Sequence, residues 1–316
     1  MSTTSSISAV QSPRLTAEAV PERITPVETS WPARILVCAH HSASTGEALS
    51  TAKALAVRSG ADVSLLTVFE PRVPLPNVAG KQGSARCEER DRGAAAELIR
   101  AVRSEERERF DGHVAWPVHL EVGDAVKVIT EHALRVNADL LVVGLGSRDL
   151  LVRQSSVAMP VCLSRYTNVP LLAAAPMLTA LPQGVVLLVD RESPDLPMIR
   201  AALRCIEPAA LVWVVIHSGT TAHSGDGVKR DKNTLAGILK MIRREAATVS
   251  KGIVVRGLYR SGDPADAVLS LAREVGADLI VTPVHGAAGT IRSLVPNVAD
   301  RLLLTAPCSV LVVPET

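Results

Sequence analysis

The sequence predicts an α/β fold in which two doubly wound domains follow one another along the chain. Three observations predict it: a length of 316 residues, an internal repeat, and short apolar runs that alternate with segments of helical periodicity. Domains run to roughly 100–200 residues, so this length suits two of them. Unbroken apolar runs are typical of parallel strands that helices cover on both faces. Alternating strands and helices of this kind form right-handed crossovers in a parallel sheet.

The internal repeat consists of two strings that recur with the same spacing. Glu121-Val-Gly-Asp-Ala-Val and, later, Asn137-Ala-Asp-Leu-Leu-Val return as Arg260-Ser-Gly-Asp-Pro-Ala and Gly276-Ala-Asp-Leu-Ile-Val. The glycines and the aspartates of the two copies lie 139 positions apart, and each copy opens and closes on an apolar run. We therefore divide the chain into a disordered tail at 1–32, a first domain at 33–176, a linker at 177–183 and a second domain at 184–316.

Within the first domain the elements follow in strand–helix order. We expect strands at 35–39, 63–68, 114–122, 140–143 and 169–174, and helices at 46–59, 94–109 and 125–136. The apolar residues of the first helix recur at the spacing of one amphipathic face. Asp124 directly precedes the third helix, where its side chain would cap the first turn. In the second domain the first and last strands fall at 184–190 and 308–313.

Ligands of doubly wound sheets bind beyond the carboxyl ends of the strands, where the strand order reverses. The turns after the first and fourth strands of each domain are therefore the candidate sites. In the first domain these turns hold His40-His41 and Gly144-Leu-Gly-Ser. In the second domain they hold Asp190 and the segment from Pro283 to Gly286.

Several strings of the chain resemble the universal stress protein family. They are Val122-Gly-Asp-Ala, Ser261-Gly-Asp-Pro-Ala-Asp-Ala-Val, Asn297-Val-Ala-Asp-Arg-Leu-Leu and Ala306-Pro-Cys-Ser-Val-Leu-Val-Val, and the resemblance extends from Arg34 to Pro314. It implies the adenine nucleotide α-hydrolase-like fold, a five-stranded parallel sheet in each half with the first and fourth strands adjacent. It also implies that the two domains pair through their last strands inside one chain. A homodimer through a further face stays open.

Nucleotide-binding members of this family hold ATP with an Asp after the first strand. After the fourth strand they carry a glycine pattern: Gly, two residues, Gly, nine residues, then Gly-Ser or Gly-Thr. An Asp accepts hydrogen bonds from the nucleoside, and glycines let backbone amides approach phosphate closely. The resemblance thus implies ATP or another adenine nucleotide as the cofactor.

Neither half keeps this whole pattern. The first half has His40 in place of the Asp, and its glycine turn begins with Gly144-Leu-Gly146-Ser. The loop to Ser155-Ser156 is two residues shorter than the family's, and Ser155 stands where the pattern has Gly, while Ser156 matches the terminal Ser. The second half keeps Asp190 and Gly286, but Pro283 replaces the first glycine and Pro296-Asn297 replaces Gly-Ser. Proline removes an amide donor. The two sites are therefore complementary remnants, and the first half is the better candidate for weak binding.

Each of these candidate ligand-binding features also has a simpler structural interpretation. The glycines also suit a tight strand-to-helix turn. Asp190 could contact a ribose or a metal, or could cap the following turn. His40-His41 has no third ligand at a suitable spacing and is more typical of a polar loop, so we expect no metal site. The connection at Pro71–Arg92 could cover the first site or lie on the surface.

Composition excludes several classes of partner. Thirty-four basic residues nearly balance 32 acidic ones and aromatics are only 2%, so we expect no nucleic-acid partner. No apolar run is long enough to span a membrane. The first thirty residues are rich in Ser, Thr, Pro and Glu and lack the apolar core of a secretory signal. Five widely spaced cysteines without a CxxC pair favour a reduced, cytoplasmic protein.

These observations favour a tandem universal-stress-type protein with a regulatory or protective role in the stress response. The expected ligand is an adenine nucleotide, bound weakly in the first domain. The alternative is a paired scaffold that binds no nucleotide and acts through protein partners. An enzyme is the least favoured class, since the sequence positions no base–nucleophile pair and no acidic metal cluster, although slow ATP hydrolysis stays open.

Overall fold

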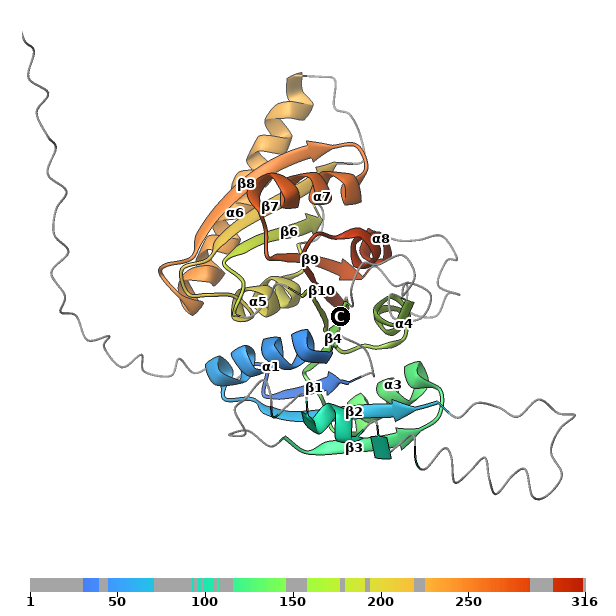
Figure 1. The fold of residues 1–316 in the computed structure, drawn as a ribbon. Coiled ribbons are helices and arrows are strands. Elements are labelled where there is room, and N and C mark those ends of the chain that lie inside the picture. Colours follow the sequence, from blue (N-terminus) through green and yellow to red (C-terminus); the bar gives the residue numbers. More distant parts are fainter. Residues whose placement is uncertain are drawn as a thin grey trace, which may run out of the picture.

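Ten strands form one continuous sheet in the computed structural model of the chain (Figure 1). The strand order is β3-β2-β1-β4-β5-β10-β9-β6-β7-β8. The structure describes residues 31–39, 45–70, 116–145, 158–176, 180–190, 194–218, 225–284 and 298–314, with short helical pieces between 93 and 107. Residues 1–30 of the proposed tail, the connection after residue 70 and part of the linker therefore lie outside the described residues. The last two residues of the proposed tail are described, and Trp31 packs against the core, so the first domain begins before residue 33.

The first repeat contributes five strands and three helices with described bounds. They are β1 (Arg34–Cys38), α1 (Thr45–Ser59), β2 (Asp62–Phe69), β3 (Val118–Val122), α3 (Ala125–Arg135), β4 (Leu140–Gly144), α4 (Ala158–Tyr166) and β5 (Leu171–Ala174). All neighbouring pairs among these strands are parallel. Of the expected helix at 94–109, only the pieces named above are described.

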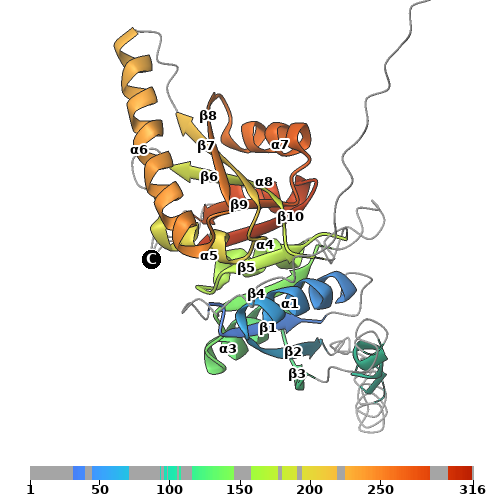
Figure 2. The ribbon, with the colours of Figure 1, turned by 90° about the vertical axis from the view of Figure 1, so that its left-hand side faces the viewer.

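The second repeat has the same order of elements. They are β6 (Gly184–Asp190), α5 (Leu196–Arg204), β7 (Leu211–Ser218), α6 (Gly225–Val249), β8 (Val254–Ser261), α7 (Pro264–Val275), β9 (Leu279–Val284), α8 (Val298–Thr305) and β10 (Ser309–Pro314). Its strands are also parallel to one another. Figure 2 shows α6 and α7 on opposite faces of β6, β7 and β8.

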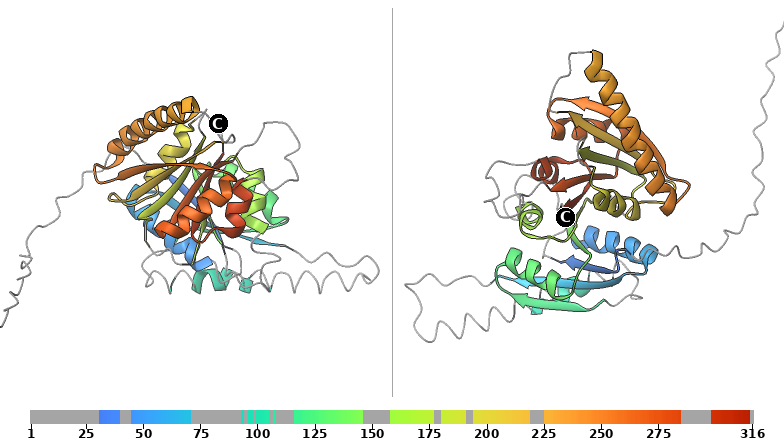
Figure 3. Two further views of the ribbon diagram at one scale, coloured as in Figure 1. Left: turned by 90° about the horizontal axis from the view of Figure 1, so that it is seen from above. Right: turned by 180° about the vertical axis from the view of Figure 1, so that it is seen from behind.

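Each face of the sheet carries one buried apolar cluster. One cluster contains residues of α1, α5 and α6, and the other contains residues of α3, α7 and α8. Both clusters run through both repeats. Figure 3 gives two further views of these layers. The two doubly wound α/β units predicted from the sequence are thus covered by helices on both faces.

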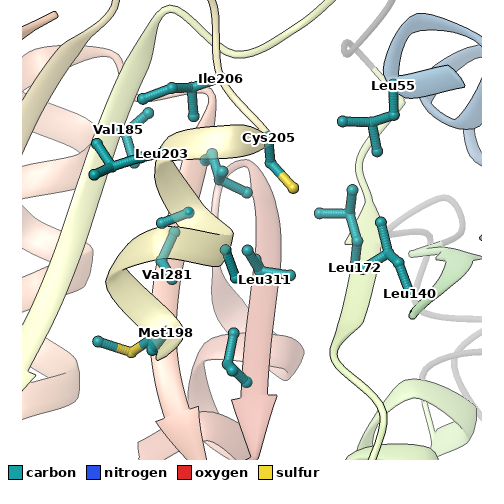
Figure 4. Packing of buried hydrophobic residues seen from close by; sticks show 14 of the residues in the cluster. Leu55, Leu140, Leu172, Val185, Met198, Leu203, Cys205, Ile206, Val281 and Leu311 are labelled. Carbon is teal, nitrogen blue, oxygen red and sulfur yellow. The ribbon is translucent and has the colours of Figure 1, made fainter. Parts of the chain in front are cut away.

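The two repeats meet where β5 and β10 pair in antiparallel fashion. Leu172 pairs with Leu311, Leu171 with Val312, and Ala173 with Val310. Because the repeats are offset by 139 positions here, Leu172 lies opposite its own equivalent, which is the arrangement of a local two-fold axis. Figure 4 shows the packing around this seam, with Cys205, which follows the last residue of α5, directed toward the side of Leu55 and Leu172.

The repeated Asp of the Ala-Asp-Leu strings anchors the start of the first strand in each repeat. Oδ2 of Asp139 accepts hydrogen bonds from the amides of Ala33 and Arg34, at 2.9 and 2.8 Å. Oδ2 of Asp278 does the same for Gln183 and Gly184, at 3.0 Å each. This conserved spacing in the sequence therefore reflects a backbone requirement of the fold.

The third strand begins later than expected. The apolar pattern predicted a strand from residue 114, whereas β3 begins at Val118. Pro117 directly precedes it, and proline has no N–H to donate to a neighbouring strand. Residues 114–115 lie outside the described part of the chain.

Candidate functional site

The strand order reverses between β1 and β4 in the first repeat and between β6 and β9 in the second. Both strands of each pair end at the same edge of the sheet, where ligands of this fold bind. Of the eight predicted site residues, the structure describes Gly144 and Asp190, which lie at this edge in different repeats. The other six lie outside the described residues: His40, Gly146, Ser155, Ser156, Gly286 and Asn297.

Gly144 is the last residue of β4 and lies opposite Ala174 of β5. Its equivalent Pro283 lies inside β9, opposite Val313. The register thus confirms that the two positions correspond. The amide of Leu145 already donates to the carbonyl of Ala174 at 2.8 Å, so any phosphate cradle in the first repeat begins after this residue.

The crevice between the first and fourth strands differs between the repeats. In the first repeat the β1–β4 ladder continues to Cys38 opposite Val143. In the second repeat the β6–β9 ladder ends at Leu187 opposite Val281, one pair earlier. The residue after Thr282 in β9 is Pro283, which has no amide hydrogen. In the second repeat the two strands therefore stop pairing one residue earlier, before they reach the candidate edge.

Asp190 is exposed at the end of β6. It does not cap the following helix α5, because Asp195 does: its Oδ1 accepts from the amide of Met198 at 3.0 Å. The second oxygen of Asp195 is buried and has no partner in the described structure. The sequence interpretation of Asp190 as a ligand residue stays open, since residues 191–193 lie outside the described part.

Five buried side-chain atoms of the first repeat lack a hydrogen-bond partner in the described structure, and besides Nη1 of Arg58 and Nε2 of His132 they are three oxygens that sequence reasoning did not single out. Oε2 of Glu47, Oγ1 of Thr51 and Oγ1 of Thr67 are buried and lack a hydrogen-bond partner in the described structure. Thr51 is 2% exposed and Thr67 is 0% exposed. The available signal was a pair of threonines set into an otherwise apolar helix face and strand.

The comparison with known proteins decides the family. The model of the universal stress protein family matches residues 33–164 and again residues 184–314. The chain belongs to the universal stress protein family. Each of its two repeats is one universal stress domain, and this confirms the resemblance found in the sequence.

Individual relatives agree with this assignment. Universal stress protein YxiE of Bacillus subtilis is 32% identical over 76 residues, which are 24% of this chain and 50% of that protein. The alignment therefore spans about half the length of this relative. A universal stress protein from Archaeoglobus fulgidus DSM 4304 covers 89% of this chain and 96% of its own, with a TM-score of 0.61 and 16% identity, which establishes the fold. A universal stress protein solved in complex with cAMP covers 43% of this chain and 100% of its own, at 25% identity and a TM-score of 0.34.

The Gly-Asp pair that marks both universal stress domains has a structural role. Gly123 and Gly262 have φ values of +148° and +99°, which favour glycine. Asp124 then caps α3 by accepting from the amide of Lys127 at 2.9 Å, as the sequence predicted, and Asp263 caps α7 in the same way. The hydrogen bond from the Asp266 amide, together with Arg301, lowers the pKa of Asp263.

A second carboxylate lies at the start of α3. Oε1 of Glu70, one residue beyond β2, accepts from the amide of Ala125 at 2.8 Å. The N-terminus of α3 in this universal stress domain is therefore already occupied by two carboxylates, which neutralise its positive dipole. An anionic ligand gains little there.

The buried thiols of Cys38 and Cys205 are unreactive. Burial raises the pKa of the Cys38 and Cys205 thiols to about 12, so neither forms a thiolate at neutral pH. Cys308 is also buried, whereas Cys162 is only half-buried. All four of these described cysteines are free.

The described residues include neither a candidate metal site nor a candidate membrane-spanning helix. No group of three or more His, Cys, Asp or Glu side chains there could hold a metal ion. Among the same residues, no helix is both long and apolar enough to cross a membrane.

Proposed function

We propose that this tandem universal stress protein binds ATP or another adenine nucleotide in its first repeat and regulates or protects during stress without catalysing a reaction. The observation that carries the proposal is the difference at the fourth strands. Gly144 ends β4 in the first repeat, whereas Pro283 occupies the equivalent position in the second. Glycine permits close approach of backbone to phosphate, and proline removes one of the donors.

The edge of the first repeat supports this choice in a second way. Its β1–β4 ladder reaches Val143, so the two strands stay at hydrogen-bonding distance up to the candidate edge. A ligand that contacts the turns after both strands then meets them at a fixed separation. The second repeat, whose ladder stops one pair earlier, offers a less defined frame.

A test compares ATP binding by the wild-type protein and two matched double variants, using isothermal titration calorimetry. The first-repeat variant is Gly144→Val with Ser156→Ala, and the control is Pro283→Val with Asn297→Ala in the second repeat. We expect the first pair to abolish heat of ATP binding and the control pair to leave it unchanged. Denaturing the purified protein and separating released nucleotides by chromatography identifies what it carries from the cell.

The same experiment separates the alternatives. A wild-type protein that carries no nucleotide and gives no heat with millimolar ATP contradicts the proposal and favours the paired scaffold, which acts through protein partners. Steady release of ADP over many turnovers contradicts the proposal that the protein acts without catalysing a reaction. The localisation that we infer, the cytoplasm, is tested by fractionation of cells.

A further inference from the structure

The strand pair at the seam between the two repeats is apolar and symmetric. Leu172 lies opposite Leu311, its own equivalent 139 positions later, and the flanking pairs join only alanine, valine and leucine. Two copies of the first repeat, or two copies of the second, would present the same kind of strand to each other. The strand pair therefore holds two repeats together without distinguishing like repeats from unlike ones.

Helices α4 and α8 contact each other beside this seam and add an ion pair between the repeats (Figure 1). Arg165 of α4 donates from Nε to Oδ1 and Oδ2 of Asp300 of α8, at 3.4 and 3.2 Å, and from Nη2 to Oδ2. Asp300 is buried. The first repeat thus supplies the guanidinium, and the second supplies a carboxylate that is shielded from water.

The two helices keep the 139-residue offset of the strands beside them. At the end of α4 the Thr167 amide donates to the Leu163 carbonyl at 2.9 Å, and at the end of α8 the Ala306 amide donates to the Leu302 carbonyl at 2.8 Å. Leu163 and Leu302 are both fully buried. Each residue of α4 can therefore be matched with its equivalent in α8.

This match shows that the ion pair has no counterpart across the local two-fold axis. The equivalent of Arg165 is Leu304, and the equivalent of Asp300 is Val161. Two copies of the first repeat would place Arg165 against Val161, and two copies of the second would place Asp300 against Leu304. In a like pair the buried carboxylate loses the guanidinium, and removal of one partner from a buried ion pair is strongly destabilising.

A buried hydrogen bond across the seam has the same asymmetry. The amide of Ala175, one residue beyond β5, donates to Oγ of Ser309 in β10 at 3.0 Å, and both residues are buried. The equivalent of Ala175 is Pro314, which has no amide hydrogen, and the equivalent of Ser309 is Pro170, which has no hydroxyl. Neither like pair can form this bond. In both contacts the first repeat provides the donor and the second repeat provides the acceptor.

We propose that these two seam contacts, Arg165 with Asp300 and Ala175 with Ser309, make the seam selective, so that a first repeat pairs with a second repeat and not with its own kind. The apolar strands supply affinity, and the polar groups penalise like pairs. Pairing of like repeats would let each chain join two further copies and form open assemblies. The selective seam instead keeps the pairing closed within one chain. This inference does not depend on the nucleotide site.

The test begins with the full chain and removes the advantage that the linker gives to pairing within one chain. A protease site is inserted in the linker at 177–183, and the folded protein is cut there and mixed with an equal amount of its isotope-labelled form. The mixture is unfolded in urea and refolded by dilution, and native mass spectrometry counts the pairs of halves. Unlike pairs that combine labelled with unlabelled halves show that the halves have separated and paired again.

We expect the wild type to form unlike pairs only. The variant Arg165→Leu, Asp300→Val, Ser309→Ala carries apolar side chains on both sides of the axis. We expect its ratio of unlike to like pairs to fall at least about tenfold, toward the random mixture in which both kinds are equally frequent. Replacing both members of a buried ion pair by apolar residues preserves folding in other proteins. The variant with Arg165→Leu and Asp300→Val alone gives the same readout if the third substitution prevents refolding.

Arg200→Met with Glu245→Met is the matched control. Arg200 of α5 donates from Nε to Oε2 of Glu245 of α6 at 2.8 Å, so this ion pair lies within the second repeat. Its loss removes the same two charges without altering the seam. We expect the control to form unlike pairs only, as the wild type does.

Four results would overturn the inference. Equal numbers of like and unlike pairs from the wild type would mean that the seam does not select. Wild-type halves that stay unpaired after refolding would mean that the seam does not hold an unlike pair without the linker. If both seam variants still form unlike pairs only, the selection lies elsewhere in the chain. Like pairs from the control would mean that lost stability, and not the loss of the seam contacts, changes the pairing.

Discussion

The two universal stress domains of this chain share their framework and differ at one edge of the sheet. In both, the Asp just before the fourth strand anchors the start of the first strand, and a Gly-Asp pair, in which the Gly has positive φ and the Asp caps the helix, begins α3 and α7. At the carboxyl ends of the strands the copies diverge. Gly144 becomes Pro283, and His40 becomes Asp190.

This difference teaches which residues the fold itself requires. Residues that satisfy backbone amides or allow unusual φ values are retained in both copies, because their loss leaves backbone donors unpaired or strains the backbone. Under the proposed function, residues at the open ends of the strands satisfy a ligand rather than the backbone, so one copy can lose them and the protein still folds. Substitutions at three places in the framework test how far the two copies share it, in order of decreasing effect.

The largest effect is expected where the copies meet. Leu172 and Leu311 are 2% and 0% exposed and lie opposite each other across the seam. Substituting either by Ala leaves a cavity in a core that both repeats share, at a cost of about 2–5 kcal/mol of unfolding free energy. Urea denaturation measures this loss. Leu134→Ala is the control, since Leu134 is 59% exposed on α3, and it changes stability by less than about 0.5 kcal/mol.

The seam also predicts how the two substitutions combine. Because the leucines are in contact across one strand pair, the double variant departs from the sum of the single ones by about 0.5–3 kcal/mol. Additive losses, or two separate unfolding transitions in the wild type, would show that the repeats are stabilised independently. Either result would contradict the claim that the two repeats share one core.

A smaller effect is expected at the ion pair between α4 and α8. Arg165 donates from Nε to Asp300 Oδ2 at 3.2 Å, and the side chain of Asp300 is only 2% exposed. Arg165→Met leaves a buried carboxylate without this guanidinium. Since Arg165 is 28% exposed, water partly compensates, and we expect a loss of about 1–3 kcal/mol.

Arg301→Met is the matched control for that substitution. Arg301 pairs with Asp263 and Asp266 at 2.7 Å each, but all three side chains are well exposed. Screening by solvent weakens such pairs, so this variant loses less stability than Arg165→Met in the same urea titration. The reverse order would mean that burial of Asp300 does not determine the strength of the contact.

The sequence predicted the framework of this molecule more completely than its site. The 139-residue repeat, the cap at Asp124 and the apolar strands followed from local patterns, because each depends on neighbours within a few residues or on burial. The buried, unpartnered oxygens of Glu47, Thr51 and Thr67 did not, since their burial depends on how α1 and β2 pack in the folded layer. The absence of partners for their oxygen atoms is a property of the packed layer and leaves no local pattern.

The smallest effect concerns an ion pair whose polarity is reversed between the repeats. Glu121 of β3 binds Arg135 of α3 at 2.9 and 3.2 Å, while Arg260 and Glu274, 139 positions later, form the opposite pair at 3.4 Å. The first pair has an additional member, His132, whose Nδ1 is 2.7 Å from Glu121, and buried Leu271 takes its place in the second repeat. The hydrogen bonds from Arg135 and His132 lower the pKa of Glu121.

A lowered pKa in the folded state gives this pair a definite pH dependence. The folded protein binds a proton at Glu121 less readily than the unfolded chain does, so the pair stabilises fully above the ordinary value of 4.5 and progressively less as the pH falls below it. Glu121→Gln removes this contribution, so the unfolding free energy of the variant falls less steeply as the pH is lowered (the acid limb). We expect the difference in unfolding free energy to be on the order of 0.5 kcal/mol after allowance for solvent screening. Urea titrations at pH 7 and pH 3.5 measure the difference, with Glu274→Gln as the control from the second repeat. Because Glu274 has one weaker contact and no histidine beside it, its variant follows the wild-type acid limb more closely. Equal flattening by both variants would mean that the extra histidine contact does not distinguish the two repeats.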